Sequence, residues 1–388
     1  MSAIEIIAIA GLLVWLYLVL LHGGFWRTRE REEVHDFRDS PPNFDWPSIV
    51  AIIPARNEAD VLPRSLASLA AQNYPGEFSI VLVDDQSSDG TSDVAQRIAN
   101  EAGRKITVVS GAALPSGWTG KVWAMHQGIA VASDQADAPQ YFLLTDADIG
   151  YEPDVLTSLV QRASGENRVL TSVMAKLNCE SFAEKALVPA FVFFFKMLYP
   201  FAWANRAIAR TAAAAGGCML VERLALERAG GIAAIRGALI DDCTLAKNMK
   251  VQGPIWLGMS ERVVSLRSYP KVDDIRRMVA RSAYAQLHYS PLLLLGTVAG
   301  LSVIYLAPPA IFLAGSYPAW VLAGITYLLM AVSFQPTLRF YHRSPLWGLG
   351  LPLIAAAYLV FTLDSAYQHG AGRGGLWKGR VQAQAGKQ

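Results

Sequence analysis

Two pairs of aspartates are the groups in this sequence best suited to bind a divalent cation. Asp84–Asp85 and Asp146–Asp148 each follow a short apolar run that favours a β-strand, at 78–83 and 141–144. Carboxylates gathered in one place repel one another, so they need a cation or a positively charged substrate. Oxygen ligands of this kind suit Mg²⁺ or Mn²⁺, and diphosphate oxygens can complete the coordination shell. The alternative is a solvated acidic turn or a helix cap.

The surrounding pattern of strands and helices positions these aspartates. The sequence predicts strands at 49–53, 78–83, 106–109 and 141–144, and helices from about residue 60, at 91–102, at 121–132 and after Pro153. Alternating strands and helices predict an α/β fold with a parallel-rich sheet. In open α/β sheets the ligand crevice lies at the carboxyl ends of the strands, where both aspartate pairs are expected.

Other binding motifs are missing or out of context. The sequence has no P-loop, and the GxGxxG match at Gly370, Gly372 and Gly375 follows no strand, so we interpret it as a chance match. The three cysteines show no metal-binding spacing, which favours reduced thiols in a cytosolic domain. A net charge of +2 is too weak a bias to indicate nucleic-acid binding.

The composition indicates a membrane protein with one water-facing domain. Hydrophobic residues make up 53% of the chain and charged residues 17%, against an average of about 25% charged residues. The shortage of charge is local, because Arg339, Arg343 and Asp364 are the only charged residues between 290 and 370. That stretch is expected in the membrane.

An apolar segment at 3–21 predicts an N-terminal anchor, since about 19 residues can cross a hydrocarbon layer of ~30 Å. A cleaved signal peptide is disfavoured, because no Lys or Arg precedes the segment and Gly23–Trp26 is a poor cleavage site. Three arginines follow between 27 and 31, so the positive-inside rule places the next domain in the cytoplasm.

Three further apolar segments lie at 290–315, 319–334 and 346–362. Pro308–Pro309 predicts a kink or break in the first, and the other two are short for full spans. Three crossings would leave the basic tail outside, against the positive-inside rule, so a re-entrant or interfacial segment is favoured. The number of crossings and the side of the tail stay open.

A fifth apolar run, 186–204, contains Lys196 as its only charge. A crossing here would put the two halves of the hydrophilic domain on opposite sides of the bilayer. Four of its residues recur with helical spacing on one face: Phe191, Phe194, Phe195 and Leu198. We therefore predict a helix on the membrane surface. The expected division is an anchor at 1–24, a catalytic domain at 25–288, a transmembrane region at 289–368 and a basic tail at 369–388.

Taken together, the motifs resemble those of family 2 glycosyltransferases, which have the Rossmann-like GT-A fold. The matching stretches run in family order over roughly 48–288: residues 53–58, 83–91, 120–124, the Asp146/Asp148 pair and 239–242. Residues 114–121 and 278–284 are similar to the hopene-associated group of hopanoid gene clusters, and the membrane layout resembles that of ceramide glucosyltransferases.

This resemblance implies a role for each matching residue in binding a nucleotide-sugar donor. The implied donor-binding residues are Pro54, Arg56 and Glu58 in the nucleotide pocket, Asp84 or Asp85 at the uracil and ribose, Lys121 at the diphosphate, and Asp146 and Asp148 at the Mg²⁺ or Mn²⁺ ion. For Lys121 the alternative is a surface lysine at a helix start.

The resemblance also implies an inverting reaction with Asp242 as the general base. The preceding residue is Asp241, where the family has Glu. The metal ion, Lys121 and Arg281 would stabilise the leaving diphosphate. The alternatives are a helix N-terminus for the aspartates and an amphipathic membrane-surface helix for Arg281. Gly216 resembles part of the acceptor-side loop, where glycine allows close approach of a substrate.

One departure from the family narrows the expected acceptor. Many members have Gln-x-x-Arg-Trp around the position of Arg281, whereas this chain has Met278 and Ser282 at the flanking positions. The missing Trp disfavours a processive polymerase and favours a single transfer to a lipid. We therefore expect transfer from a UDP-sugar to a hopanoid-related lipid at the cytoplasmic face of a bacterial inner membrane. The alternatives are a polyprenyl phosphate or ceramide-like acceptor, or an inactive scaffold, which the intact Asp148 and Asp242 disfavour.

Overall fold

A computed structural model describes residues 1–32, 44–134, 137–378 and 380–381. The chain forms two compact units. The helical unit comprises Met1–Arg29, Cys179–Ala202 and Tyr269–Gly375, and the sheet unit comprises Glu30–Asn178, Trp203–Ser268 and Leu376–Gln388. The domains expected from the sequence are continuous stretches of chain, whereas the compact units are not. Residues 179–202 and 269–288 belong to the helical unit, and the segment from residue 376 belongs to the sheet unit.

The sheet unit contains an eight-stranded mixed sheet with the order β3-β2-β1-β4-β7-β6-β8-β5. Its strands are β1 (Ile49–Ala55), β2 (Phe78–Asp84), β3 (Ile106–Ser110), β4 (Tyr141–Thr145), β5 (Ile149–Tyr151), β6 (Leu170–Lys176), β7 (Cys218–Glu222) and β8 (Ile255–Ser265). The four strands expected from the sequence all form and pair in parallel as β3-β2-β1-β4. Strand β7 is antiparallel to β4 and β6, and β5 is antiparallel to β8. The expected α/β Rossmann-like fold is confirmed, with a mixed sheet.

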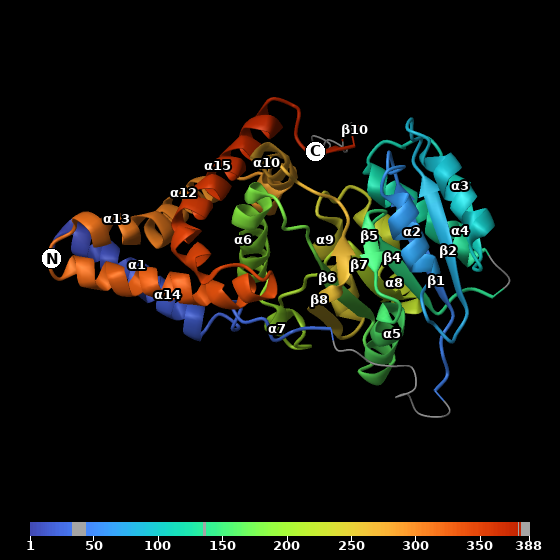
Figure 1. Ribbon diagram of the computed structural model, residues 1–388, viewed down its shortest axis with the longest axis horizontal. Helices are drawn as coiled ribbons and strands as arrows, with labels where there is room; N and C mark the ends of the chain where they lie inside the picture. The colour runs from blue at the N-terminus through green and yellow to red at the C-terminus, as the bar shows by residue number, and fades with distance from the viewer. Residues whose placement is uncertain (33–43, 135–136, 379, 382–388) are drawn as a thin grey trace. The chain divides into compact units, whose positions relative to one another are not determined.

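Helices cover both faces of this sheet (Figure 1). Alternate residues of the central strands belong to opposite core clusters. On β1, Ile49, Ala51 and Ile53 face one cluster, and Val50 and Ile52 face the other. The first cluster contains residues of α2 (Leu62–Ala70), α3 (Thr91–Glu101) and α5 (Val155–Gly165). The second contains residues of α4 (Gly120–Ser133), α8 (Arg223–Arg228) and α9 (Asp241–Gln252). Burial on both faces explains why the central strands are continuously apolar.

The helical unit contains four helices that are long and apolar enough to cross a membrane: Ala3–Leu20, Pro291–Ala314, Ala319–Phe340 and Pro345–Gly370. Its elements are α1 (Ala3–Leu20), α6 (Phe182–Leu198), α10 (Val272–Ala280), α11 (Ala283–Gln286), α12 (Pro291–Leu301), α13 (Ala307–Ala314), α14 (Ala319–Phe340) and α15 (Leu351–Gly370); α7 (Phe201–Ala204) lies at a boundary between the units.

One expectation about these spans was wrong. The last two segments are not short, because α14 and α15 continue past the apolar stretch to Phe340 and Gly370. The first C-terminal segment does not break, and the irregularity expected at its prolines takes the form of a π-helical turn just before them. A π-helical turn at Ser302–Leu306 leads directly into α13, whose first turn holds Pro308, a position where no backbone donor is needed.

Helix α6, the expected surface helix, begins with a capping box formed by Ser181 and Glu184. It packs against α10, α14 and α15 within the helical unit. Of the four residues expected to face lipid, Leu198 is exposed, whereas the ring of Phe194 contacts Tyr305 and Tyr358. Much of this face is therefore packed against protein, and a position of α6 at the membrane surface stays a prediction.

Candidate active site

The carboxyl ends of β1, β2 and β4 meet at one edge of the sheet because the three strands run in parallel. Strand β7 runs the other way, so the Gly216–Gly217 loop that precedes it reaches the same edge, where the carbonyl of Gly217 accepts from Asp146 N at 3.4 Å. This edge therefore brings together groups from distant parts of the chain, as expected for an open α/β sheet.

A first group of charged residues, the lysine cluster, consists of Lys121, Asp146, Asp241 and Asp242. Lys121 Nζ lies 2.7 Å from Asp146 Oδ1 and 3.2 Å from Asp241 Oδ2. Burial alone would lower the pKa of Lys121, but these carboxylates outweigh burial and raise the pKa, so the lysine stays charged. Burial raises the pKa of Asp146, and Lys121 opposes that shift only in part. The sequence-predicted residues of this group are thus brought together.

The surroundings of Asp242 raise the pKa of its carboxyl group towards neutral pH. Its Oδ2 accepts a hydrogen bond from Gly216 N at 3.0 Å, and its Oδ1 accepts one from Cys243 N at 2.7 Å. Burial and the neighbouring charge of Asp241 raise the pKa of Asp242 to about 6, against the opposing effect of Lys121. A carboxylate with such a pKa can accept a proton effectively near pH 7.

Space around Gly216 is tight. A Cβ at this position would lie 3.2 Å from Lys121 Nζ and 3.4 Å from both Cβ and Oδ2 of Asp242. A side chain here would push apart the lysine and the carboxylate.

A second group, the arginine cluster, consists of Glu58, Asp148, Arg267 and Lys378. Arg267 follows the end of β8; its Nε lies 2.8 Å from Asp148 Oδ2, and its Nη2 contacts Glu58 Oε2. Lys378 Nζ lies 2.9 Å from Glu58 Oε1. Burial raises the pKa of Glu58, and the two cations counter only part of that effect.

Sequence reasoning missed both cations of the arginine cluster. Arg267 belongs to no recognisable motif, and Lys378 was assigned to a basic tail. Neither residue carries a local signal, because the segment before Arg267 contains Ser260, Glu261 and Arg262 and does not form a long apolar run.

The other expected donor-binding residues lie on the neighbouring loops. Pro54 pairs with Val83 between β1 and β2. Arg56 Nη1 donates to the backbone carbonyls of Asp85 and Gln86, the latter at 3.2 Å, and so fastens the loop after β1 to the loop after β2. Asp85 is fully buried.

The carboxylate of Asp84 caps its own turn, because its Oδ1 accepts hydrogen bonds from the backbone N and the hydroxyl of Ser87. Arg281 belongs to the helical unit, where it is an exposed residue at the end of α10. Its catalytic role therefore stays a prediction.

The chemistry of the donor set fits a divalent cation at Asp146 and Asp148. Two hard carboxylates project from one turn, and each is paired with a positive side chain, Lys121 or Arg267. Among the described residues no group of three or more His, Cys, Asp and Glu side chains gathers to hold a metal. The remaining ligands would therefore come from a substrate or from water.

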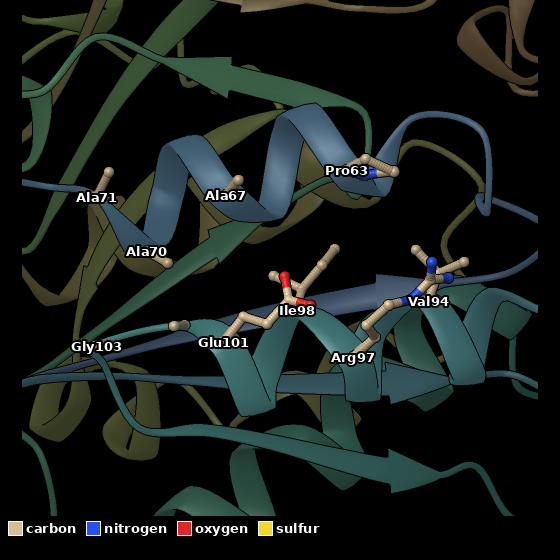
Figure 2. A pocket seen from close by; sticks show the side chains of 10 residues that line it. Pro63, Ala67, Ala70, Ala71, Val94, Arg97, Ile98, Glu101 and Gly103 are labelled. Atoms are coloured by element: carbon tan, nitrogen blue, oxygen red, sulfur yellow. The ribbon is translucent and has the colours of Figure 1, made fainter.

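A separate groove of about 440 Å³ lies between α2 and α3 (Figure 2). Small side chains of α2 line one side of it, among them Ala67 and Ala70, and Val94 and Ile98 of α3 line the other. Its lining contains none of the residues of the two clusters, so the groove is distinct from the candidate site.

Comparisons with known proteins agree on the type of domain. The model of glycosyl transferase family 2 matches residues 50–229. An N-acetylglucosaminyltransferase of Mesorhizobium japonicum is 29% identical over 147 residues, which cover 38% of this chain and 32% of that protein. A 4,4'-diaponeurosporenoate glycosyltransferase of Staphylococcus haemolyticus is 32% identical over 126 residues, which cover 32% of this chain and 31% of that protein. The chain thus spans about a third of the length of these relatives.

Among solved structures, the mannosyltransferase PcManGT from Pyrobaculum calidifontis, in complex with GDP-Man and Mn²⁺, is similar with a TM-score of 0.57. The sequence identity is 20%, and the match covers 93% of this chain and 99% of that one. At this identity the likeness concerns the fold. The family model over residues 50–229 supports a family 2 glycosyltransferase domain in this region, and the sheet topology and the likeness to PcManGT show the Rossmann-like GT-A fold.

Proposed function

We propose that the protein is an inverting, metal-dependent glycosyltransferase that moves a sugar from a nucleotide-sugar donor to a hydroxyl group of a membrane lipid. The position of Lys121 carries this proposal. Its ammonium group lies between Asp146, an expected metal ligand, and Asp241, the neighbour of the expected base. The ammonium group of Lys121 thus lies between the proposed site of the leaving diphosphate, at Asp146, and the proposed site of proton removal, at Asp241 and Asp242.

In the proposed reaction Asp242 removes the proton of the acceptor hydroxyl as that oxygen attacks the anomeric carbon of the sugar. The pKa of about 6 lets this carboxylate be ionised at pH 7 and still accept a proton. Lys121 places a positive charge beside the leaving diphosphate. A divalent ion held by Asp146 and Asp148 would add Lewis-acid stabilisation of that negative charge. Arg281 is proposed to assist the leaving group from the end of α10.

The donor is proposed to be a nucleoside diphosphate sugar. The bound GDP-Man and Mn²⁺ of PcManGT support a nucleotide-sugar with a divalent ion. Within that class a UDP-sugar is proposed, from the resemblance of residues 53–58 and 83–91 to the family's nucleotide-binding motifs.

A membrane lipid is proposed as the acceptor because four helices of this chain are suited to span a bilayer. A relative named for 4,4'-diaponeurosporenoate also supports a lipid-like acceptor. The choice of a hopanoid-related lipid rests on the resemblance at 114–121 and 278–284. The cytoplasmic face of a bacterial inner membrane is proposed as the place of the reaction, and the arginines after the first span support it through the positive-inside rule.

The test is a transfer assay with the full-length protein in lipid nanodiscs. UDP-sugars and GDP-mannose are each supplied with Mn²⁺ and with a hydroxylated hopanoid, a ceramide or a polyprenyl phosphate, and glycolipids are identified by mass spectrometry. We expect a glycosylated hopanoid from a UDP-sugar, formed about 10²–10⁴-fold more slowly by the Asp242→Asn variant.

A product formed on ceramide or polyprenyl phosphate would move the proposal to that acceptor. Binding of the nucleotide with no product on any lipid would favour the inactive scaffold. Full transfer in the presence of EDTA would reject the metal role of Asp146 and Asp148.

A further inference from the structure

The C-terminal segment of the chain reaches the loop that is expected to bind the nucleotide. Two short strands, β9 (Leu376–Trp377) and β10 (Arg380–Val381), pair in antiparallel fashion within the sheet unit. Between them, Lys378 Nζ donates to the backbone carbonyl of Asn57 at 3.0 Å and contacts Glu58 Oε1 at 2.9 Å. Arg56 Nε in turn donates to the carbonyl of Lys378 at 3.2 Å. Three consecutive residues of the loop after β1 therefore hold Lys378.

The surroundings of Lys378 connect it to the expected metal ligand. Glu58 is 6% exposed, and its two carboxylate oxygens are shared between Lys378 and Arg267. Arg267 also pairs with Asp148. Glu58 is therefore the one residue that lies between Lys378 and Arg267, and Arg267 pairs with the expected metal ligand Asp148.

The charges of the arginine cluster predict an affinity for an anion. Glu58 and Asp148 balance Arg267 and Lys378 in the structure. When a divalent cation neutralises Asp148, the two basic side chains share one carboxylate and the cluster has an excess of positive charge. A diphosphate is the anion that would accompany the cation.

The ammonium group of Lys378 can take part in that binding. It has three N–H donors, and within the described part of the chain Asn57 and Glu58 engage two of them. An ammonium held in place and partly removed from water binds a phosphate more strongly than a free surface lysine does, because the ordering cost is met in advance.

We propose that Lys378 is a donor-binding residue that contacts the diphosphate of the nucleotide-sugar. This inference rests on the proposed function. It extends the donor site from the loops of the sheet to the C-terminal segment, and it gives Arg267 and Glu58 the role of positioning that segment.

The experiment measures equilibrium binding by calorimetry, with the full-length protein in nanodiscs and Mg²⁺ present. The ligands are UDP and GDP, each compared with its nucleoside, uridine or guanosine. Lys378→Gln removes the charge and keeps the length of the side chain, and Lys378→Arg keeps the charge. Arg373→Gln is the matched control, because this cation is close to Lys378 in the sequence but belongs to the helical unit, where it contacts Gln368 and the ring of Tyr367.

We expect Lys378→Gln to weaken binding of the diphosphate by about tenfold to a hundredfold, in line with loss of a hydrogen bond to a charged group. Affinity for the nucleoside should not change, Lys378→Arg should restore most of the loss, and Arg373→Gln should bind as the parent does. The thermal unfolding midpoint of each variant checks that the fold is retained.

Four results would overturn the inference. An equal loss for nucleoside and diphosphate would mean that Lys378 shapes the pocket without touching phosphate. Unchanged binding of the diphosphate by Lys378→Gln would mean that Lys378 does not contact the donor. Tighter binding would mean that Lys378 competes with the donor. Failure of the parent protein to bind either diphosphate would overturn the proposed function itself, and the inference with it.

Discussion

Two sets of charged side chains, one at the edge of the sheet and one inside the helical unit, are held in different ways. In the sheet unit Lys121, Asp148 and Glu58 are held by oppositely charged side chains. In the helical unit, the buried Glu184 accepts hydrogen bonds from the backbone N–H groups of Glu180, Ser181 and Tyr269. The buried Lys196 likewise donates to the backbone carbonyl of Arg27.

This difference distinguishes side chains that can bind a ligand from side chains that stabilise the fold. Side-chain ion pairs can exchange one partner for a ligand without moving the backbone, so the charges at the sheet edge can be taken over by a metal ion or a diphosphate. A carboxylate held by three backbone donors has no such freedom, because its loss leaves those donors unsatisfied. The ion-paired charges at this sheet edge are therefore candidates for function, whereas the backbone-held Glu184 of the helical unit is a candidate for a structural role.

The largest effect is expected from Asp242→Asn, which removes the proposed base. Because a general base contributes about 10²–10⁴-fold, kcat should fall by that factor while donor binding and the unfolding midpoint stay near parental values. Single-turnover assays with a lipid acceptor measure the rate, and calorimetry with UDP measures binding. A variant that keeps more than about a tenth of the parental kcat, well outside that range, would remove Asp242 from the mechanism.

A loss of about 10²–10³-fold in transfer is expected from Asp148→Asn, because a metal ion contributes several kcal/mol of charge stabilisation. The protein should remain folded, since Arg267 keeps its contact with Glu58. Titration of Mn²⁺ into parent and variant checks the cause directly. Equal metal affinity in the two proteins would show that Asp148 is not a ligand.

A substitution in the helical unit should lower stability and leave the reaction rate unchanged. Glu184→Gln leaves part of the buried backbone N–H set without an acceptor, so the free energy of unfolding should fall by about 1–3 kcal/mol. The kcat of the folded protein should be unchanged. Thermal unfolding in detergent and kcat per folded molecule are the two measurements. A drop in kcat without a change in unfolding would contradict the distinction between the two units.

A smaller and graded effect is expected from pH. The pKa of Asp242 is raised to about 6, and the base acts when it is deprotonated. Transfer should therefore be constant above pH 7 and fall as pH decreases through 6, by about tenfold for each further unit. A rate profile measured from pH 5 to 8 tests this. A flat profile down to pH 5 would mean that another group sets the proton transfer.

The strands β1 to β4 and the aspartates at their ends could be predicted from the sequence, because strand pattern and turn residues are local properties of contiguous residues. The sequence also specified Asp146, Asp148 and Asp242 as candidates through their motifs. It did not predict β5 to β8, whose pairing joins segments such as Leu170–Lys176 and Ile255–Ser265 that are distant along the chain.

The partners of the charged residues were decided by the tertiary structure alone. The motif around Lys121 indicates a phosphate-binding lysine, but its position between Asp146 and Asp241 depends on how α4, β4 and α9 meet at one edge. Arg267 and Lys378 have no local signal, because an isolated cation at a strand end or in a tail looks like a solvated surface residue. The pairing of Arg267 with Asp148 follows from the antiparallel pairing of β5 with β8, and Lys378 reaches Asn57 and Glu58 from the C-terminal segment.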